Sequence, residues 1–166
     1  MRVPTPARLL LPALSAALAV PLLTAAPGAA AASAEFGPLV RFKSAKFGKC
    51  IFDTPGGGGS NYKLRDCHED DLRQQFARDQ LGDGSIVYKG VASGQCLDNN
   101  GTAAYAHDCN SSGYQHWWEK NKAGPVITLQ NQQTLQCLDS DGENVYVHEC
   151  GELTNPNQRW QIVTLP

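Results

Sequence analysis

The sequence lacks the charge pattern of most nucleic-acid-binding and membrane-surface proteins. Its 14 Lys and Arg residues are fewer than its 16 Asp and Glu residues, which gives a formal net charge of −2. Nucleic acids and anionic lipids are bound by clustered Lys and Arg side chains. We therefore expect no nucleic-acid partner and no electrostatic attachment to a membrane.

The chain also lacks the short motifs of several kinds of chemistry. Its six cysteines form no C-x-x-C pair, and the adjacent Cys67 and His68 have no matching second pair, which argues against a zinc site. No G-x-S-x-G motif is present for a nucleophilic serine. The glycine-rich stretch 55–60 is not followed by the Lys-Ser/Thr of a phosphate-binding loop, so a flexible loop is expected there. The sequence predicts no cofactor.

Long apolar runs are missing except near the start of the chain. Residues 9–23 are apolar apart from two prolines and one serine, two arginines precede them, and the small residues 32–34 follow. A membrane anchor is the alternative, but this run is shorter than the ~20 residues of a spanning helix. The pattern predicts a secretory signal peptide over 1–34 and a secreted domain over 35–166, without membrane insertion.

Helical periodicity is absent from the rest of the chain, where short β-rich runs recur instead. Three of these runs, Leu39–Phe42, Ile86–Lys89 and Val126–Gln130, are each followed by two cysteines and then by Gln-x-Phe or Gln-x-Trp. The closing aromatics Phe76 and Trp117 are 41 residues apart, and Trp160 lies 43 residues further on. This period is the size of one supersecondary unit, so the sequence predicts three four-stranded repeats with the closing aromatics in the core.

Each repeat carries two cysteines in equivalent places. Six cysteines allow 15 connectivities, but the repeat symmetry selects one in which each unit closes its own pair. Cysteines of a secreted chain are expected to be oxidised. The predicted disulfides are Cys50 with Cys67, Cys96 with Cys109, and Cys137 with Cys150.

Three units of this kind, each with a Cys-x-Asp-like start and a Gln-x-aromatic end, resemble the ricin B-type lectins. The resemblance implies an all-β fold, a β-trefoil of three four-stranded repeats with one disulfide per repeat. The repeats are also similar to the small lectin repeats appended to some bacterial and insect toxins. This second likeness implies a toxin or enzyme partner chain.

The resemblance assigns sugar-binding roles in the third repeat. Asp139, two residues after the first cysteine, is expected to accept hydrogen bonds from sugar hydroxyls. His148 stands where the family has a stacking Trp or Tyr, so the smaller platform is expected to be shared with Tyr146, which alternation places on the same strand face. Asn157 completes the hydroxyl contacts, and Gln158 holds the aspartate.

The same positions are less complete in the second repeat. Asp98, Tyr105, His107 and Gln115 correspond to the residues of the third repeat, but Tyr114 stands where an Asn would be helpful. We therefore expect a weaker pocket there.

The first repeat departs further from the pattern. Its aspartate is displaced by one place to Asp53, which leaves Phe52 at the expected position. Lys63 and Arg65 replace the tyrosine and histidine, so a stacking surface is missing. We expect this repeat to be structural.

Carbohydrate binding is therefore the predicted function, with galactose-type or plant polysaccharide glycans as the partners that the resemblance implies. An enzyme is not expected, because glycoside hydrolysis needs two carboxylates across one bond and each repeat supplies one. The alternative is a non-catalytic trefoil module, an inhibitor or toxin accessory subunit, that binds protein and has lost its sugar. Asp139 and Asp98 would then only satisfy backbone donors in turns.

Overall fold

A computed structural model describes residues 37–54, 62–151 and 155–166 of the chain. These residues form three successive units, each of four short strands with a 3₁₀ helix before the last strand. The first unit contains β1 (Leu39–Ser44), β2 (Cys50–Phe52), β3 (Lys63–Arg65), η1 (Leu72–Gln74) and β4 (Phe76–Gln80). The second contains β5 (Ile86–Gly90), β6 (Cys96–Asn99), β7 (Ala104–His107), η2 (Gly113–Gln115) and β8 (Trp117–Ala123). The third contains β9 (Val126–Asn131), β10 (Cys137–Ser140), β11 (Val145–His148), η3 (Pro156–Gln158) and β12 (Trp160–Thr164).

The first and last strands of the three units close into a six-stranded antiparallel barrel. The pairs run β1 with β4, β4 with β5, β5 with β8, β8 with β9, β9 with β12, and β12 with β1. Closure pairs both edges of every barrel strand and so removes the exposed edges of an open sheet. The all-β trefoil predicted from the sequence is thereby confirmed.

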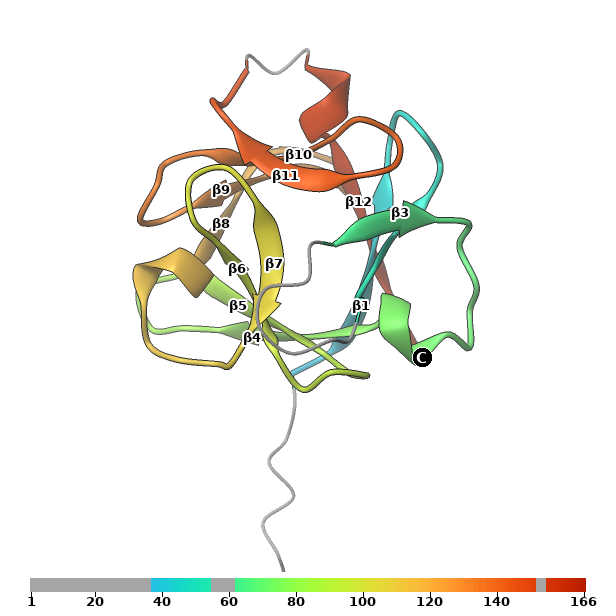
Figure 1. Cartoon of the computed structure of the whole chain (residues 1–166), viewed down its shortest axis with the longest axis horizontal. Coiled ribbons are helices and arrows are strands. Elements are labelled where there is room, and N and C mark those ends of the chain that lie inside the picture. The colour runs from blue at the N-terminus through green and yellow to red at the C-terminus, as the bar shows by residue number, and fades with distance from the viewer. Residues whose placement is uncertain (1–36, 55–61, 152–154) are drawn as a thin grey trace, which may run out of the picture. The chain divides into compact units, whose positions relative to one another are not determined.

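The two middle strands of each unit form a hairpin, and Figure 1 shows the three hairpins arranged around a common centre. Backbone bonds join the hairpins to one another. The Tyr62 N–H donates to the carbonyl of Ala104, and the Val145 N–H donates to the carbonyl of Tyr62. Backbone hydrogen bonds therefore hold each hairpin against its neighbours.

Aromatic side chains from all three repeats fill the core. The closing aromatics Phe76, Trp117 and Trp160 are fully buried, as the sequence predicted. The indole N–H of each tryptophan donates to a backbone carbonyl, that of Leu97 or that of Leu138. Burial of an indole is favourable only when its N–H finds such an acceptor.

The three disulfides are those that the repeat symmetry predicts. Cys50 bonds to Cys67, Cys96 to Cys109, and Cys137 to Cys150. Each closes a hairpin of its own repeat, with a sequence separation of 17 in the first and 13 in the other two. Loops of this length are expected to contribute about 3 kcal/mol each by restricting the unfolded chain.

The three 3₁₀ helices were not predicted. Each begins after a polar residue whose side chain accepts the N–H two positions later, and these residues are Asp71, Ser112 and Asn155. Such caps favour a short turn over a strand. The expected signal peptide, 1–34, and the glycine-rich loop, 55–60, lie outside the described residues. No helix in the described part of the chain is long and apolar enough to span a membrane.

Candidate functional site

Strand register places three of the predicted residues of the third repeat on one face of its hairpin, whereas Asn157 and Gln158 lie on η3. Asp139 on β10 lies directly opposite Tyr146 on β11, and Cys137 lies opposite His148. Opposed residues of an antiparallel pair project to the same side. Tyr146 is thus the direct neighbour of Asp139, whereas His148 lies two residues further along and is exposed.

The carboxylate of Asp139 is 3 % exposed and half satisfied. Its Oδ2 accepts a 2.8 Å hydrogen bond from Gln158 Nε2, and its Oδ1 is buried without a hydrogen-bond partner among the described residues. Burial, followed by the charge of Asp139 and the contact with it, raises the pKa of Tyr146 to about 12. The phenol therefore stays neutral beside the carboxylate.

Gln158 connects the aspartate to the loop after the second cysteine. Its Nε2 also donates to the carbonyl of Glu149, and its Oε1 accepts the N–H of Gly151. One side chain therefore fixes both the loop and the carboxylate. On the other side of the site, Lys46 of the first repeat donates to Oδ1 of Asn157 at 2.9 Å.

The second repeat reproduces this arrangement. Asp98 lies opposite Tyr105 in the register and is 5 % exposed. Its Oδ2 accepts a 2.7 Å hydrogen bond from Gln115 Nε2, which also donates to the carbonyl of Asp108. Burial and then the neighbouring Asp98 raise the pKa of Tyr105. The carboxylate, glutamine and tyrosine thus recur with the same contacts one repeat earlier in the chain.

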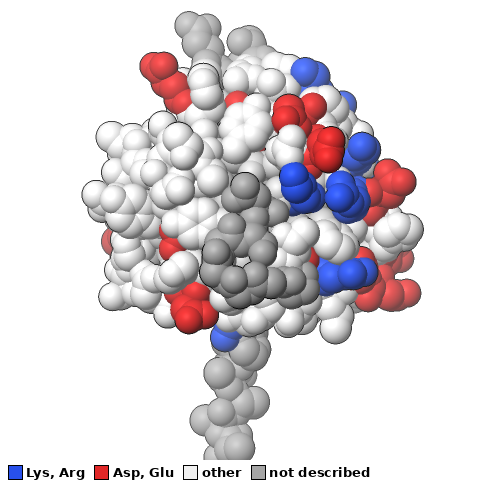
Figure 2. Space-filling model, in the orientation of Figure 1, with Lys and Arg blue, Asp and Glu red and all other residues white. Residues whose placement is uncertain are grey.

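A hollow of about 240 Å³ opens above Asp98. It lies over the hairpin of β6 and β7, where Figure 2 shows a largely uncharged surface, while Lys and Arg side chains gather toward β3. Polar side chains and aromatic rings line it together. The lining residues are Asp98, Asn99, Asn100, Tyr105, His107, Asn110, Ser112 and Tyr114.

The first repeat has no carboxylate at this place. Phe52 stands where Asp98 and Asp139 stand, and the guanidinium of Arg73 lies over its ring, 4.5 Å from the centroid. Lys63, opposite Phe52, donates to the Asn144 side chain of the third repeat. Arg65 donates to the carbonyl of Leu64. The guanidinium occupies one face of this ring, and the phenyl side chain has no carboxylate oxygen to accept a sugar hydroxyl.

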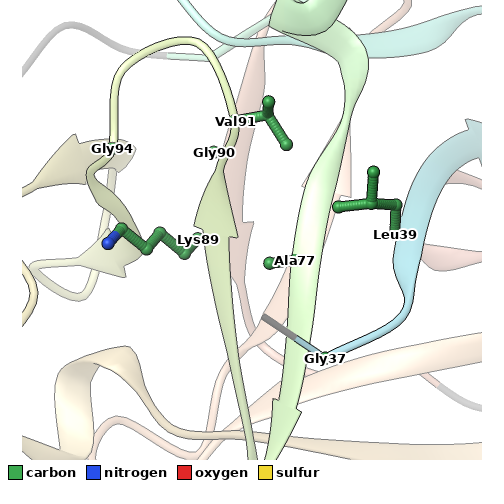
Figure 3. Close-up of a pocket in the computed structure, with 7 residues that line it drawn as sticks. All are labelled: Gly37, Leu39, Ala77, Lys89, Gly90, Val91 and Gly94. Carbon is green, nitrogen blue, oxygen red and sulfur yellow. The ribbon is translucent and has the colours of Figure 1, made fainter. Parts of the chain in front are cut away.

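The largest hollow among those described, about 510 Å³, lies elsewhere. Figure 3 shows it between β1, β4 and β5, where Leu39, Ala77 and Val91 present aliphatic side chains and three glycines leave room. Of the residues drawn, only Lys89 carries a charge, and none has an aromatic ring. Its size alone does not make it a sugar site, since hydroxyl groups need convergent polar partners.

Sequence analysis missed two contributors to the candidate sites. Lys46 reaches the third site from the first repeat, and Asn110 lines the second hollow from the loop after the second cysteine. Both positions depend on how the repeats and loops fold together, and no local pattern marks them. The described residues contain no group of three or more His, Cys, Asp or Glu side chains that could hold a metal ion.

Comparison with solved structures shows the same fold in several proteins, lectins among them. A designed threefold-symmetric protein, ThreeFoil, matches with a TM-score of 0.69 and 21% identity, over 76% of this chain and 99% of that one. The hemolytic lectin CEL-III matches with a TM-score of 0.63 and 26% identity, over 76% of this chain and 31% of that one. A Polyporus squamosus lectin, solved with a human-type influenza-binding epitope, matches at 0.67 and 14%, over 77% of this chain and 49% of that one.

Comparison with curated proteins finds no match. The model of the ricin-type β-trefoil lectin domain matches residues 38–160 and so includes all three repeats. Asp98 and Asp139, the glutamines that hold them and the closed barrel lie within this range. The chain belongs to the ricin-type β-trefoil lectin domain family, a family of carbohydrate-binding modules.

Proposed function

We propose that the protein is a non-catalytic lectin that binds sugar residues at two pockets, one in the second repeat and one in the third. The observation that carries the proposal is the buried Oδ1 of Asp139, which has no partner among the described residues. A buried acceptor without a partner costs about 1–3 kcal/mol. A sugar hydroxyl would satisfy it, and the neighbouring Tyr146 offers an aromatic face for the C–H face of the same ring.

For a single terminal sugar residue, the third pocket is the stronger of the two. It has Asn157, whose amide both donates and accepts hydrogen bonds, where the second repeat has Tyr114. The first repeat is structural, because Arg73 covers Phe52. Affinity at one pocket is expected to be on the order of millimolar, so two pockets on one body act through avidity on multivalent glycans.

A glycan array followed by titration of single-site variants tests the proposal. Asp139→Asn keeps the shape of the side chain but replaces one carboxylate oxygen by a donor, so binding at the third pocket should be lost. Asp98→Asn should remove the second pocket, and the double variant should not bind. Glu149→Gln removes the same charge from an exposed side chain directly after β11, and it is the matched control. Binding that survives in the double variant would contradict the assignment of both pockets.

The alternative is a trefoil that binds protein and has lost its sugar. The first repeat favours this alternative, because Arg73 covers the Phe52 ring at the position where the other two repeats have their aspartate. A folded protein with no glycan ligand on the array would support this alternative. Galactose-type and plant polysaccharide glycans are the first classes to test.

We infer further that the protein is extracellular, with residues 1–34 as its secretory signal. Three disulfides in one small domain support an oxidising compartment. A toxin or enzyme partner chain is also part of the proposal, because a unit similar to this one makes up only 31% of the hemolytic lectin CEL-III. Detection of the mature protein in culture medium, beginning near Glu35, tests the first inference.

A further inference from the structure

The second pocket has an aromatic wall that the third lacks. Tyr114 is 41 % exposed. Four large hydrophobic side chains are exposed in the described part of the chain, and Tyr114 is the only aromatic one of them. It lines the same hollow as Asp98 and Tyr105 but comes from η2. The ring therefore stands at the rim of the hollow, across from the hairpin that carries the buried carboxylate.

The backbone of Tyr114 is held in place. Its carbonyl accepts hydrogen bonds from the side-chain amides of Asn99, at 3.0 Å, and Asn131, at 2.8 Å, and its N–H donates to the hydroxyl of Ser112. An exposed ring on a fixed backbone has few rotatable bonds left to order. It can contact a ligand at a small cost in conformational entropy.

The depth of the two rings assigns them to different parts of a ligand. Tyr105 is half-buried and directly opposite Asp98, so it faces whatever the carboxylate holds. Tyr114 is more exposed, so it faces the part of the ligand that leaves the hollow. In the third repeat the same position carries Asn157, whose side chain is engaged by Lys46 and offers no flat apolar surface.

We propose that the second pocket recognises two consecutive sugar residues of a glycan chain, the first held by Asp98 and Tyr105 and the second stacked on Tyr114. This inference rests on the proposed function and deepens it. The third pocket takes a single terminal residue. The two pockets thus differ in the length of ligand that they bind. The affinity of the second pocket relative to the third increases when the ligand is a disaccharide or longer.

The test uses the full chain with Asp139→Ala, so that only the second pocket reports, and compares it with the same chain carrying Tyr114→Asn. The probes are galactose and lactose, and xylose and xylobiose, each titrated by chemical-shift changes. One aromatic stacking contact corresponds to about a twofold to tenfold change in affinity. Tyr114→Asn should lower the disaccharide affinity by that factor and should not lower the monosaccharide affinity, because the new amide can only add hydroxyl contacts to the first sugar. Tyr114→Phe should keep the disaccharide preference.

A reciprocal variant makes the test independent of this one position. Asn157→Tyr in an Asp98→Ala background should give the third pocket a disaccharide preference that it lacks. A disaccharide-to-monosaccharide ratio unaffected by Tyr114→Asn would overturn the inference while leaving the lectin function intact. So would an equal loss for both probes, because Tyr114 would then hold the first sugar. Absence of binding by the unaltered chain to all four sugars and to the glycan array would overturn both proposals.

Discussion

Gln158 and Asp139 are joined by a 2.8 Å hydrogen bond, although 19 residues separate them in the chain. The same glutamine bonds to the backbone of Glu149 and Gly151. The residue that marks the repeat in the sequence therefore also orients the proposed ligand-binding carboxylate. Fold and site are connected through one side chain.

This connection predicts an asymmetric response to Gln→Glu changes. Gln74 in the first repeat makes the same two backbone contacts, with Asp66 and His68, but faces no carboxylate, because Phe52 is there. Gln158→Glu should therefore destabilise the fold by about 1–3 kcal/mol more than Gln74→Glu at neutral pH, since it adds a second buried carboxylate. Denaturant unfolding of both variants measures the difference.

The difference should shrink in mild acid, where one proton taken up by the two carboxyl groups removes the repulsion between them. Equal destabilisation by the two variants at every pH would show that Asp139 is not held by Gln158 in the way described. Gln158→Glu should also weaken sugar binding, whereas Gln74→Glu should not.

Trp160 predicts a separation of stability from binding. Trp160→Ala should cost about 3–5 kcal/mol as a large core truncation. Trp160→Phe copies the Phe76 of the first repeat and leaves the Leu138 carbonyl without the indole donor, so it should cost about 1–3 kcal/mol. Thermal unfolding and sugar titration of each variant measure the two properties.

Asp139→Ala should affect binding and not stability, the opposite of the effect expected for the core residue Trp160. It should change the free energy of unfolding by less than about 1 kcal/mol and abolish binding at the third pocket. If Asp139→Ala and Trp160→Ala altered stability and binding to similar degrees, the division into core and pocket residues would be wrong.

The fold was accessible from sequence because its signals are local and repeated three times. Cysteine pairs and Gln-x-aromatic ends recur at a near-constant period, and strand alternation alone places Tyr146 and His148 on one strand face. What remained hidden depends on contacts between repeats. Lys46 reaches Asn157 across the closure of the barrel, a separation of 111 residues.

The contact of Arg73 with Phe52 in the first repeat could not be predicted from the sequence either. Sequence identified Phe52 as a departure from the pattern but gave no sign that Arg73 would lie over it. That contact needs η1, whose position is set by the Asp71 cap and by packing on the hairpin. Short 3₁₀ turns leave almost no periodic signal in three residues.

Glu119 gives a prediction for stability in acid. Burial alone would raise its pKa, but hydrogen bonds from Arg78, Tyr88 and Lys122 outweigh burial and lower the pKa from 4.5 to about 2. A depressed folded-state pKa contributes stability that is present above pH 4.5 and is lost as pH falls toward 2. The contribution is about 3 kcal/mol as an upper bound.

Glu119→Gln removes this pH-dependent contribution. The variant should be less stable than the unaltered chain at pH 6, and the difference should disappear near pH 2. Urea unfolding at a series of pH values measures it. A stability difference that stays constant across the range would mean that Glu119 contributes through packing and not through its charge.

Asp53 should make stability depend on pH in the opposite direction to Glu119. Its carboxylate is fully buried between the first and second repeats, close to Ser93 and to Gly90, whose missing Cβ leaves it room. Burial raises its pKa, while contacts with Ser93 oppose this effect. At the equivalent place between the second and third repeats stands Asn99, whose amide donates to Tyr114 and accepts from Thr134.

A raised folded-state pKa gives stability that is fully present below the unfolded-state pKa, near 4, and is lost as pH rises through the folded-state value. Asp53→Asn should therefore raise the free energy of unfolding at neutral pH, by about 1 kcal/mol or more, and should have no advantage below about pH 4. Asn99→Asp is the matched control and should destabilise the chain at neutral pH and recover in acid. If Asp53→Asn lowered stability at neutral pH, the Asp53 carboxylate would have to be a favourable, charged part of the junction, and its burial would not be a cost.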